Sequence, residues 1–278
     1  MKKYMPLEGL RWSRDSGSTL CDTPQNGRSR TGWGVTPQTY LDCIKEVMTI
    51  EEAIKQRHSV RNYIHKPLST EVVRALEVKI GECNKEGGLH IQLVTQETKA
   101  FTGIMSYGKF HGVENYLVMA GKKADDLDER IGYYGEQLVL LAQTLGLNTC
   151  WVGLSYRKVK EAYHIEEGEK LACMIALGYG KTQGASHKIK TIEQVSNATG
   201  DSPSWFRKGV EAALLAPTAI NQQKFSFLLQ SQESPGVEGK AKVLAKKGFS
   251  MVGYTQMDLG IAKLHFEIGA GTENFEWE

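Results

Sequence analysis

Three cationic side chains and one hydroxyl group lie within five positions of the segment RHSVRNY, residues 57–63. They belong to Arg57, His58, Ser59 and Arg61. An arginine can bind a phosphate dianion through two parallel hydrogen bonds, and a serine hydroxyl can add a neutral one. The same cations at the end of a helix could also compensate the helix dipole while fully solvated. The segment alone therefore leaves two interpretations open, a phosphate site and a solvated cationic turn.

Composition excludes the classes of protein that would need a broad positive surface. The 278 residues include 34 Lys plus Arg and 32 Asp plus Glu, so the cationic excess of a nucleic-acid-binding domain is missing. No run of the sequence approaches the roughly 18 apolar residues of a membrane span, and no apolar secretory stretch lies near the N-terminus. We therefore expect a cytoplasmic protein whose partners are neither nucleic acids nor membranes.

The cysteines and histidines show no pattern of a metal site or a catalytic triad. Five cysteines are an odd number, and they are widely spaced without a Cys-x-x-Cys pair. We expect structural thiols and no metal. Several histidines stand in local contexts that predict surface or packing roles, namely His111, His164, His187 and His265.

Helices are predicted wherever caps precede an amphipathic pattern. Residues 1–47 show no period of two or 3.6, which predicts a disordered or non-native extension, and the folded pattern begins at Met48. Thr49 with Glu52 forms a capping-box pattern, and Ser69 or Thr70 can cap a second helix. The longest helical pattern covers residues 126–146. Ser204 is expected to cap a further helix that ends before Pro217.

Strand patterns alternate with these helices. They are expected at 89–96, 114–121, 147–154, 169–180 and 224–230, and residues 248–271 predict a short strand followed by a helix. Two similar α/β units in one chain suggest a duplication. We divide the folded part into a first half, 48–190, and a second, shorter half, 191–278.

Two motifs of this sequence resemble those of the FMN-dependent nitroreductase family. RHSVRNY matches the family's Arg-x-Ser-x-Arg/Lys-x-aromatic motif through Arg57, Ser59, Arg61 and Tyr63. APTAINQQKF, residues 216–225, resembles the loop Ala-Pro-Ser-x-x-Asn-x-Gln-Pro-Trp, although Lys-Phe replaces its Pro-Trp ending. The resemblance covers most of 48–278 and none of 1–47.

The resemblance implies an α+β sandwich of the nitroreductase type, and the split order of the motifs implies more. Family members carry both motifs close together in one chain and form each flavin site between two subunits. Here each motif occurs in a different half, so the chain looks like an intramolecular pseudo-dimer with a single FMN site. This arrangement is similar to the single-chain, thermophile-type subgroup. It implies a monomer in solution.

The family's binding residues carry over onto matching positions of this chain. Arg57 and Ser59, with His58 through its backbone, would bind the FMN phosphate, and Arg61 would reach the N1/O2 edge of the ring. The other expected flavin-binding residues are Lys188 and Lys190 at the phosphate, Pro217, Thr218 and Asn221 along the ring, and Gly153 and Leu154 near N5.

The activity implied by the resemblance is hydride transfer from NADH or NADPH, through flavin N5, to a small electron acceptor such as a nitro compound or a quinone. No side chain is expected to serve as a catalytic acid or base. The alternative is a degenerate flavin-binding or FMN-free protein that retains the fold for binding or regulation. The missing Pro-Trp favours this alternative, and purified protein without flavin would support it.

Overall fold

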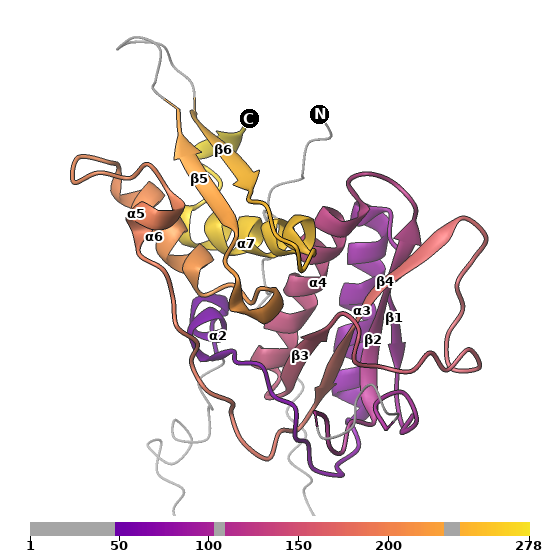
Figure 1. The fold of residues 1–278 in the computed structure, drawn as a ribbon. Helices are drawn as coiled ribbons and strands as arrows, with labels where there is room; N and C mark the ends of the chain where they lie inside the picture. The colour runs from indigo at the N-terminus through magenta and orange to yellow at the C-terminus, as the bar shows by residue number, and fades with distance from the viewer. Residues whose placement is uncertain (1–47, 103–108, 231–239) are drawn as a thin grey trace, which may run out of the picture. The chain divides into compact units, whose positions relative to one another are not determined.

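The computed structural model describes residues 48–102, 109–230 and 240–278, and the structural statements below concern these residues (Figure 1). Thr49–Glu278 form one compact unit. The extension predicted at 1–47 lies outside the described residues, as do Cys21 and Cys43. The other cysteines, Cys83, Cys150 and Cys173, are buried free thiols. No described helix is both long and apolar enough to cross a bilayer.

The first two described helices begin at the predicted caps. Helix α2, Ile50–Gln56, has the full capping box, because Thr49 N donates to Glu52 Oε2 at 2.8 Å and Glu52 N donates to Thr49 Oγ1 at 3.2 Å. Helix α3, Thr70–Gly87, is capped by Ser69, whose Oγ accepts from Val72 N at 3.3 Å. Arg57 is the C-cap of α2, and its backbone there is extended.

The first sheet has the strand order β1-β2-β4-β3 with every pair antiparallel. Its strands are β1 (Gln92–Val94), β2 (Asn115–Lys122), β3 (Asn148–Val152) and β4 (Glu169–Gly178). Helix α4, Leu127–Thr144, connects β2 to β3 and is buried along almost its whole length. The four strands and this helix confirm the elements predicted for the region, with shifted ends.

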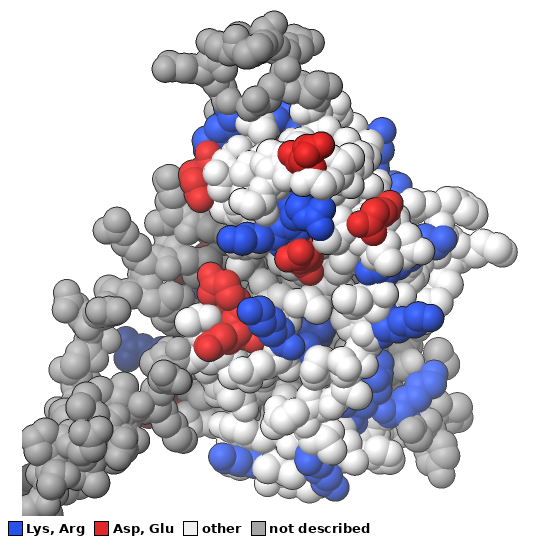
Figure 2. Space-filling model, turned by 90° about the vertical axis from the view of Figure 1, so that its left-hand side faces the viewer, with Lys and Arg blue, Asp and Glu red and all other residues white. Residues whose placement is uncertain are grey.

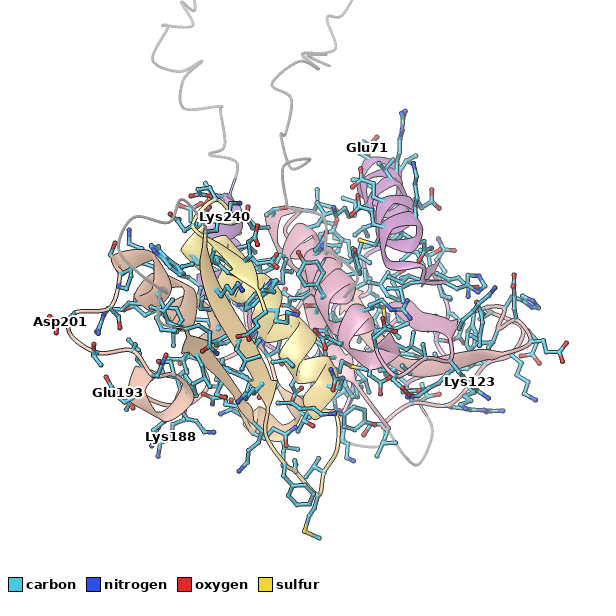
Figure 3. The ribbon with its side chains drawn as sticks, turned by 90° about the horizontal axis from the view of Figure 1, so that it is seen from above. Glu71, Lys123, Lys188, Glu193, Asp201 and Lys240 are labelled. Atoms are coloured by element: carbon cyan, nitrogen blue, oxygen red, sulfur yellow. The ribbon has the colours of Figure 1, made fainter. Side chains whose placement is uncertain are left out.

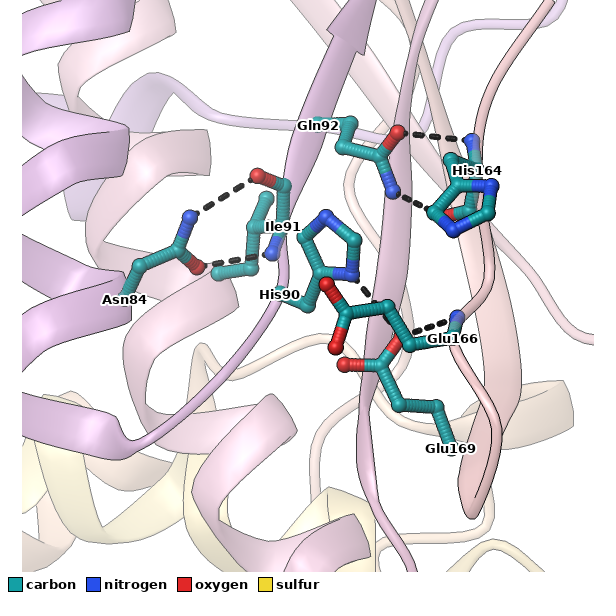
Figure 4. A network of polar contacts seen from close by, with 7 residues as sticks. All are labelled: Asn84, His90, Ile91, Gln92, His164, Glu166 and Glu169. Atoms are coloured by element: carbon teal, nitrogen blue, oxygen red, sulfur yellow. Dashed lines mark hydrogen bonds and ion pairs between the residues drawn. The ribbon is translucent and has the colours of Figure 1, made fainter.

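Strand β1 is shorter than the predicted 89–96, because a side chain binds the backbone before it. Asn84 Oδ1 accepts from Ile91 N at 2.7 Å, and Asn84 Nδ2 donates to Ile91 O at 2.9 Å (Figure 4). Both peptide groups of Ile91 are therefore occupied by the Asn84 amide. On the other side, the Gln92 side chain bonds the backbone of His164 in both directions.

The second sheet has the order β5-β6-β7. Strand β5 (Phe225–Leu229) is antiparallel to β6 (Ala241–Lys247), and β7 (Phe275–Trp277) runs parallel to β6. Three helices accompany it, α5 (Ile192–Val195), α6 (Ser204–Leu214) and α7 (Thr255–Ala270), with the short 3-10 turn η2 (Ala219–Asn221). Stacked Phe227 and Phe266, with ring centroids 4.6 Å apart, lie in the core of this part.

Two local predictions in this part are wrong. Ser204 is the first residue of α6 and makes no side-chain cap bond, since the N-cap is Pro203. The short strand expected after residue 247 is absent from the described residues, because β6 comes earlier, at 241–247. Gly253 and Tyr254 have φ of 79° and 62°, which no strand tolerates, and Phe249 and Met251 are exposed.

Helices α4 and α7 lie side by side and join the two sheets (Figure 1). Their backbones meet at two glycines. A Cβ atom on Gly132 would overlap the carbonyl of Met257, and one on Gly260 would overlap the carbonyl of Glu129. Hydrogen is therefore the largest group that fits at either position.

Candidate functional site

Arg57 is a buried cation and not part of a solvated turn. Its side chain is 3% exposed, and its Nε lies 3.7 Å from Oε1 of Glu136, which is fully buried in α4. Burial lowers the pKa of Arg57, and the charge of Glu136 opposes that shift. Since the reference pKa of arginine is above 12, the guanidinium remains charged in this position.

The residues after Arg57 run beside the first sheet. Ser59 forms a parallel bridge with Thr149 of β3, Val60 N donates to Thr149 O at 3.0 Å, and His111 N donates to Arg61 O at 2.9 Å. Burial raises the pKa of Cys150. The charge of Arg61, a hydrogen bond with Ser59 and the charge of Arg57 oppose that shift. The structure thus brings Arg57, Ser59 and Arg61 together around one thiol.

The segment 184–190 crosses this motif. Gly184 has φ of 78°, and a Cβ there would lie 2.7 Å from Cβ of His58 and 3.2 Å from Ser59 O. Further on, His187 Nε2 is 3.3 Å from Leu214 O. Burial lowers the pKa of His187, the hydrogen bond with Leu214 O opposes that shift, and the charge of Arg57 adds to it. The segment therefore lies close to the arginine motif and to the end of α6.

The two predicted lysines of this segment differ in their surroundings. Lys190 is half-buried, and its Nζ donates to Gln223 O at 2.6 Å, while its backbone N donates to Gln223 Oε1 at 2.9 Å. Lys188 is exposed, and its side chain points away from the ribbon beside Glu193 (Figure 3). Its carbonyl, however, accepts from Asn221 Nδ2 and from Gln223 Nε2, each at 2.8 Å.

The loop of residues 217–223 has a strained backbone. Ile220, Asn221 and Gln223 have φ of 47°, 57° and 46°. Such values in three non-glycine residues cost free energy and persist where the surroundings hold them, which is common at functional sites. Within the loop, Gln223 N donates to Thr218 Oγ1 at 3.1 Å, and Pro217 is half-buried just after α6.

Asp258 ties this loop to the start of α7. Its Oδ1 accepts from Ala219 N at 3.0 Å and its Oδ2 accepts from Gln222 Nε2 at 2.6 Å. The same Gln222 amide donates to Gly253 O at 3.0 Å. Burial raises the pKa of Asp258 to about 6 against the opposing hydrogen bonds. The loop is therefore bound to the residues that precede α7.

Gly153, directly after β3, meets those same residues. A Cβ on Gly153 would lie 2.5 Å from the hydroxyl of Tyr254. Leu154 is exposed next to it. Tyr254 therefore links the 153–154 backbone to the turn that the 217–223 loop holds through Gln222.

Buried polar atoms that lack hydrogen-bond partners occur both in the arginine motif and in the 217–223 loop. Within the described residues, Arg57 Nε, His58 Nδ1 and Gln222 Oε1 are buried and make no hydrogen bond. Buried polar groups are normally satisfied, so a ligand is a physical reason for such atoms. Two of them belong to the arginine motif, and Arg57 is a cation, which fits an anionic group.

Sequence reasoning missed Glu136, Tyr254 and Asp258, and it placed Gln223 in the loop motif without a binding role. One signal was available for Glu136, the carboxylate inside the apolar run GYYGEQLVLL of residues 132–141. A charged residue is seldom buried without a partner, so that position predicts a buried cation nearby. The others depend on which loops meet, and the local sequence does not contain that information.

Comparison with known proteins now identifies the family. A family model described as "Putative TM nitroreductase" matches residues 49–270. The chain belongs to this nitroreductase family. A search of curated proteins finds no match. The match of this family model confirms the resemblance that the sequence motifs indicated.

One solved structure supports the fold. A "putative nitroreductase" from Thermotoga maritima is 23% identical, with a TM-score of 0.52, over 81% of this chain and 85% of that one. It confirms the nitroreductase-like α+β fold. Two weaker likenesses follow. An FMN-dependent nitroreductase from Clostridium difficile R20291 is 18% identical, with a TM-score of 0.40, over 47% of this chain and 87% of that one. A Desulfovibrio desulfuricans protein described as "a putative nitroreductase in complex with fmn" is 17% identical, with a TM-score of 0.39, over 55% of this chain and 96% of that one.

Proposed function

We propose that this nitroreductase-family protein is an FMN-dependent oxidoreductase that takes hydride from NADH or NADPH and passes it to a nitro compound, a quinone or a similar small acceptor. The observation that carries the proposal is the buried Arg57, whose Nε has no hydrogen-bond partner among the described residues, beside His58, whose Nδ1 also has none. A phosphate would supply acceptors for both.

The residues present fit FMN in a consistent order along the site. Arg57 and Ser59 would bind its phosphate, with His58 adjacent and Lys188 and Lys190 on the crossing segment. Arg61 would place a fixed cation at the N1/O2 edge of the ring, where negative charge develops on reduction. Along the ring, the remaining residues are Pro217, Thr218, Asn221, Gly153 and Leu154.

The bound flavin would supply the hydride chemistry, and the chain would supply binding and orientation. The strained 217–223 loop, tied to Asp258 through Ala219 and Gln222, would hold one wall of the site before the ligand arrives. Gly153 leaves its backbone uncovered by any side chain of its own. Tyr254 already fills the adjacent space, which would keep water out.

We also propose that the two sheets reflect a fused pair of nitroreductase halves with one flavin per chain and a monomeric state. The arginine motif precedes the first sheet, the 217–223 loop precedes the second, and α4 packs against α7 between them. Such packing resembles a subunit interface contained in one chain. Sedimentation equilibrium tests this point, and a stable dimer would count against it.

The experiment for the cofactor is flavin retention by Arg57→Ala. The purified protein is mixed with FMN, freed of unbound flavin and measured by visible absorption. We expect about one flavin per chain in the natural protein and none in the variant, because the phosphate loses its buried cation. Arg74→Ala, at an exposed position of α3, is the matched control. Equal flavin content in both variants would contradict the assignment.

One observation favours the alternative, an FMN-free binding or regulatory protein. The charge of Arg57 already has a counter-charge in Glu136, so the buried cation does not depend on a phosphate for its neutralisation. A natural protein that stays colourless after mixing with FMN would support this alternative.

A further inference from the structure

Glu136 is a buried carboxylate that faces three nitrogen groups from three parts of the chain. Its side chain is fully buried. Oε2 accepts from Trp151 Nε1 of β3 at 2.9 Å. Oε1 lies 2.9 Å from His265 Nε2 of α7 and 3.7 Å from Arg57 Nε at the end of α2. A buried charge of this kind is stable when it is paired and hydrogen-bonded, as here.

The geometry of His265 fixes where its protons are. Its Nδ1 lies 3.1 Å from Ala212 O, and a carbonyl oxygen can only accept, so Nδ1 carries a proton. Its Nε2 faces Glu136 Oε1, and a proton must lie between them to avoid two opposed lone pairs. An ionised Glu136 carboxylate would have the Arg57 cation as a counter-charge at 3.7 Å. The proton therefore belongs to Nε2, which makes His265 an imidazolium.

The charges of the trio Arg57, Glu136 and His265 do not cancel. Two cations share one carboxylate, which leaves one positive charge in a buried place. Within residues 48–102, 109–230 and 240–278, no other carboxylate lies within ion-pair distance of Arg57 or His265. The nearest further titratable groups are His187, Cys150 and His58. Burial lowers the pKa of His187 and of His58 and raises the pKa of the Cys150 thiol, so all three favour neutral forms.

We propose that Glu136 is a positioning residue for Arg57, and that His265 stands beside it as an imidazolium, so that the trio presents a net charge of plus one to an anionic ligand. The ligand anion is the FMN phosphate, a point that rests on the proposed function. The Glu136 carboxylate lies 3.7 Å from Nε of Arg57, beyond hydrogen-bond distance, so it holds the guanidinium in place by charge and leaves Nε available to the ligand. His265, held by Ala212 O, fixes the carboxylate in turn.

The charge state is tested without any flavin, by nitrogen-15 spectroscopy of the His265 ring at neutral pH. We expect both ring nitrogens to be protonated in the natural protein. In Glu136→Gln we expect the neutral ring, because the carboxylate that stabilises the second proton is gone. A neutral His265 ring in the natural protein would overturn the charge assignment.

The positioning role is tested by comparing FMN with riboflavin, which lacks the phosphate. Glu136→Gln preserves the shape of the side chain, and we expect it to weaken FMN binding about tenfold while leaving riboflavin binding unchanged. The matched control is Glu267→Gln. Glu267 is also buried in the α4–α7 interface and accepts from a tryptophan, Trp277 Nε1 at 2.6 Å, as well as from Tyr133 Oη, yet it has no contact with Arg57.

The outcomes separate this inference from the function on which it rests. Equal loss of both flavins in Glu136→Gln, or equal FMN binding in the variant and the natural protein, would overturn the positioning role. If the natural protein binds neither flavin, the proposed cofactor is wrong and so is the positioning role of Glu136 toward it. The nitrogen-15 spectrum of His265 still decides whether that ring is charged. If Glu136→Gln does not fold, His265→Gln serves instead, because it gives Glu136 a neutral donor and should weaken FMN binding alone.

Discussion

The hydroxyl of Tyr254 lies directly over Gly153, so close that a Cβ on the glycine would be 2.5 Å from it. Tyr254 has φ of 62° and belongs to the turn before α7, whereas Gly153 follows β3. The turn is held by Gln222, which donates to Gly253 O, and by the Asp258 N to Tyr254 O bond at 2.8 Å. A strained tyrosine is thus fixed against a glycine from a distant part of the chain.

The first prediction concerns Gly153→Ala. The new methyl group would displace the Tyr254 ring, and we expect flavin binding to fall at least about tenfold. The free energy of unfolding should change by less than about 1 kcal/mol, because the obstacle is the far end of a side chain and not backbone. Flavin titration and urea unfolding measure the two effects.

Two variants control that experiment. Gly153→Ala combined with Tyr254→Ala should recover part of the flavin binding, since the clash is removed. Gly81→Ala lies on an exposed position of α3 with nothing near its Cβ, and it should stabilise the protein by about 0.5–1 kcal/mol. Unchanged flavin binding in Gly153→Ala would show that the site lies elsewhere.

The second prediction is a pH dependence that arises from Asp258. Burial raises its folded-state pKa to about 6, above the value of about 3.9 in an unfolded chain. The folded protein therefore binds the proton more tightly, and the Asp258 contribution to stability falls as pH rises from about 4 to about 6. Two pKa units correspond to at most about 3 kcal/mol.

Asp258→Asn should remove that contribution. Urea unfolding at several pH values gives the measurement, and the stability difference between the natural protein and the variant should change across the window and stay constant above it. Exposed Asp201→Asn is the control and should run parallel to the natural protein (Figure 3). Parallel curves for Asp258→Asn as well would refute the prediction.

The third prediction separates Lys188 from Lys190. Lys190→Ala loses the 2.6 Å bond from Nζ to Gln223 O, so it should lower the free energy of unfolding by about 1.5–3 kcal/mol and also weaken FMN binding. Lys188→Ala keeps the carbonyl that Asn221 and Gln223 use, so stability should stay within about 0.5 kcal/mol. Thermal or urea unfolding distinguishes the two, and equal losses in both would be inconsistent with the structure.

The fourth prediction uses the strain at Ile220. A β-branched residue at φ of 47° is unfavourable, so Ile220→Gly should stabilise the protein by about 1 kcal/mol, even though glycine adds freedom to the unfolded chain. Ile189→Gly, at an exposed position with ordinary φ, should instead destabilise it. Urea unfolding of both variants decides, and a less stable Ile220→Gly would mean that the loop is not strained there.

Local signals in the sequence predicted the elements well where those signals were sufficient. The Thr49 and Glu52 pair and the periodic apolar residues of α7, such as Leu259 and Phe266, need no distant partner to define a helix. The start of the strand expected at 89–96 could not be predicted from the sequence, because the Asn84 side chain hydrogen-bonds both the N–H and the C=O of Ile91. The turn at Gly253 and Tyr254 likewise depends on Gln222, a contact invisible in the local pattern.

The same distinction holds for the site. The types and spacing of residues 57–61 left a phosphate site and a solvated cationic turn open, and the burial of Arg57 excludes the solvated turn for that residue. The sequence could not indicate that Glu136 and His265 share the pocket of Arg57, because that depends on the packing of α4 against α7. His265, expected to be a packing or surface residue, is fully buried.

Both signs of charge occur on the face of the molecule shown in Figure 2. This mixed surface agrees with the nearly equal numbers of basic and acidic residues in the sequence. Because Arg57 is buried, dissolved salt should screen its charge less than it screens the charges on this surface.

The close approach of α4 and α7 at Gly132 and Gly260 has a consequence for how the protein can evolve. The Met257 carbonyl that lies against Gly132 is three residues from Tyr254, whose hydroxyl lies over Gly153. A single methyl group at either glycine would overlap a backbone carbonyl and force the two helices apart. Substitution at these two positions is therefore expected to be excluded by the packing of the helices alone, although neither glycine belongs to the candidate site.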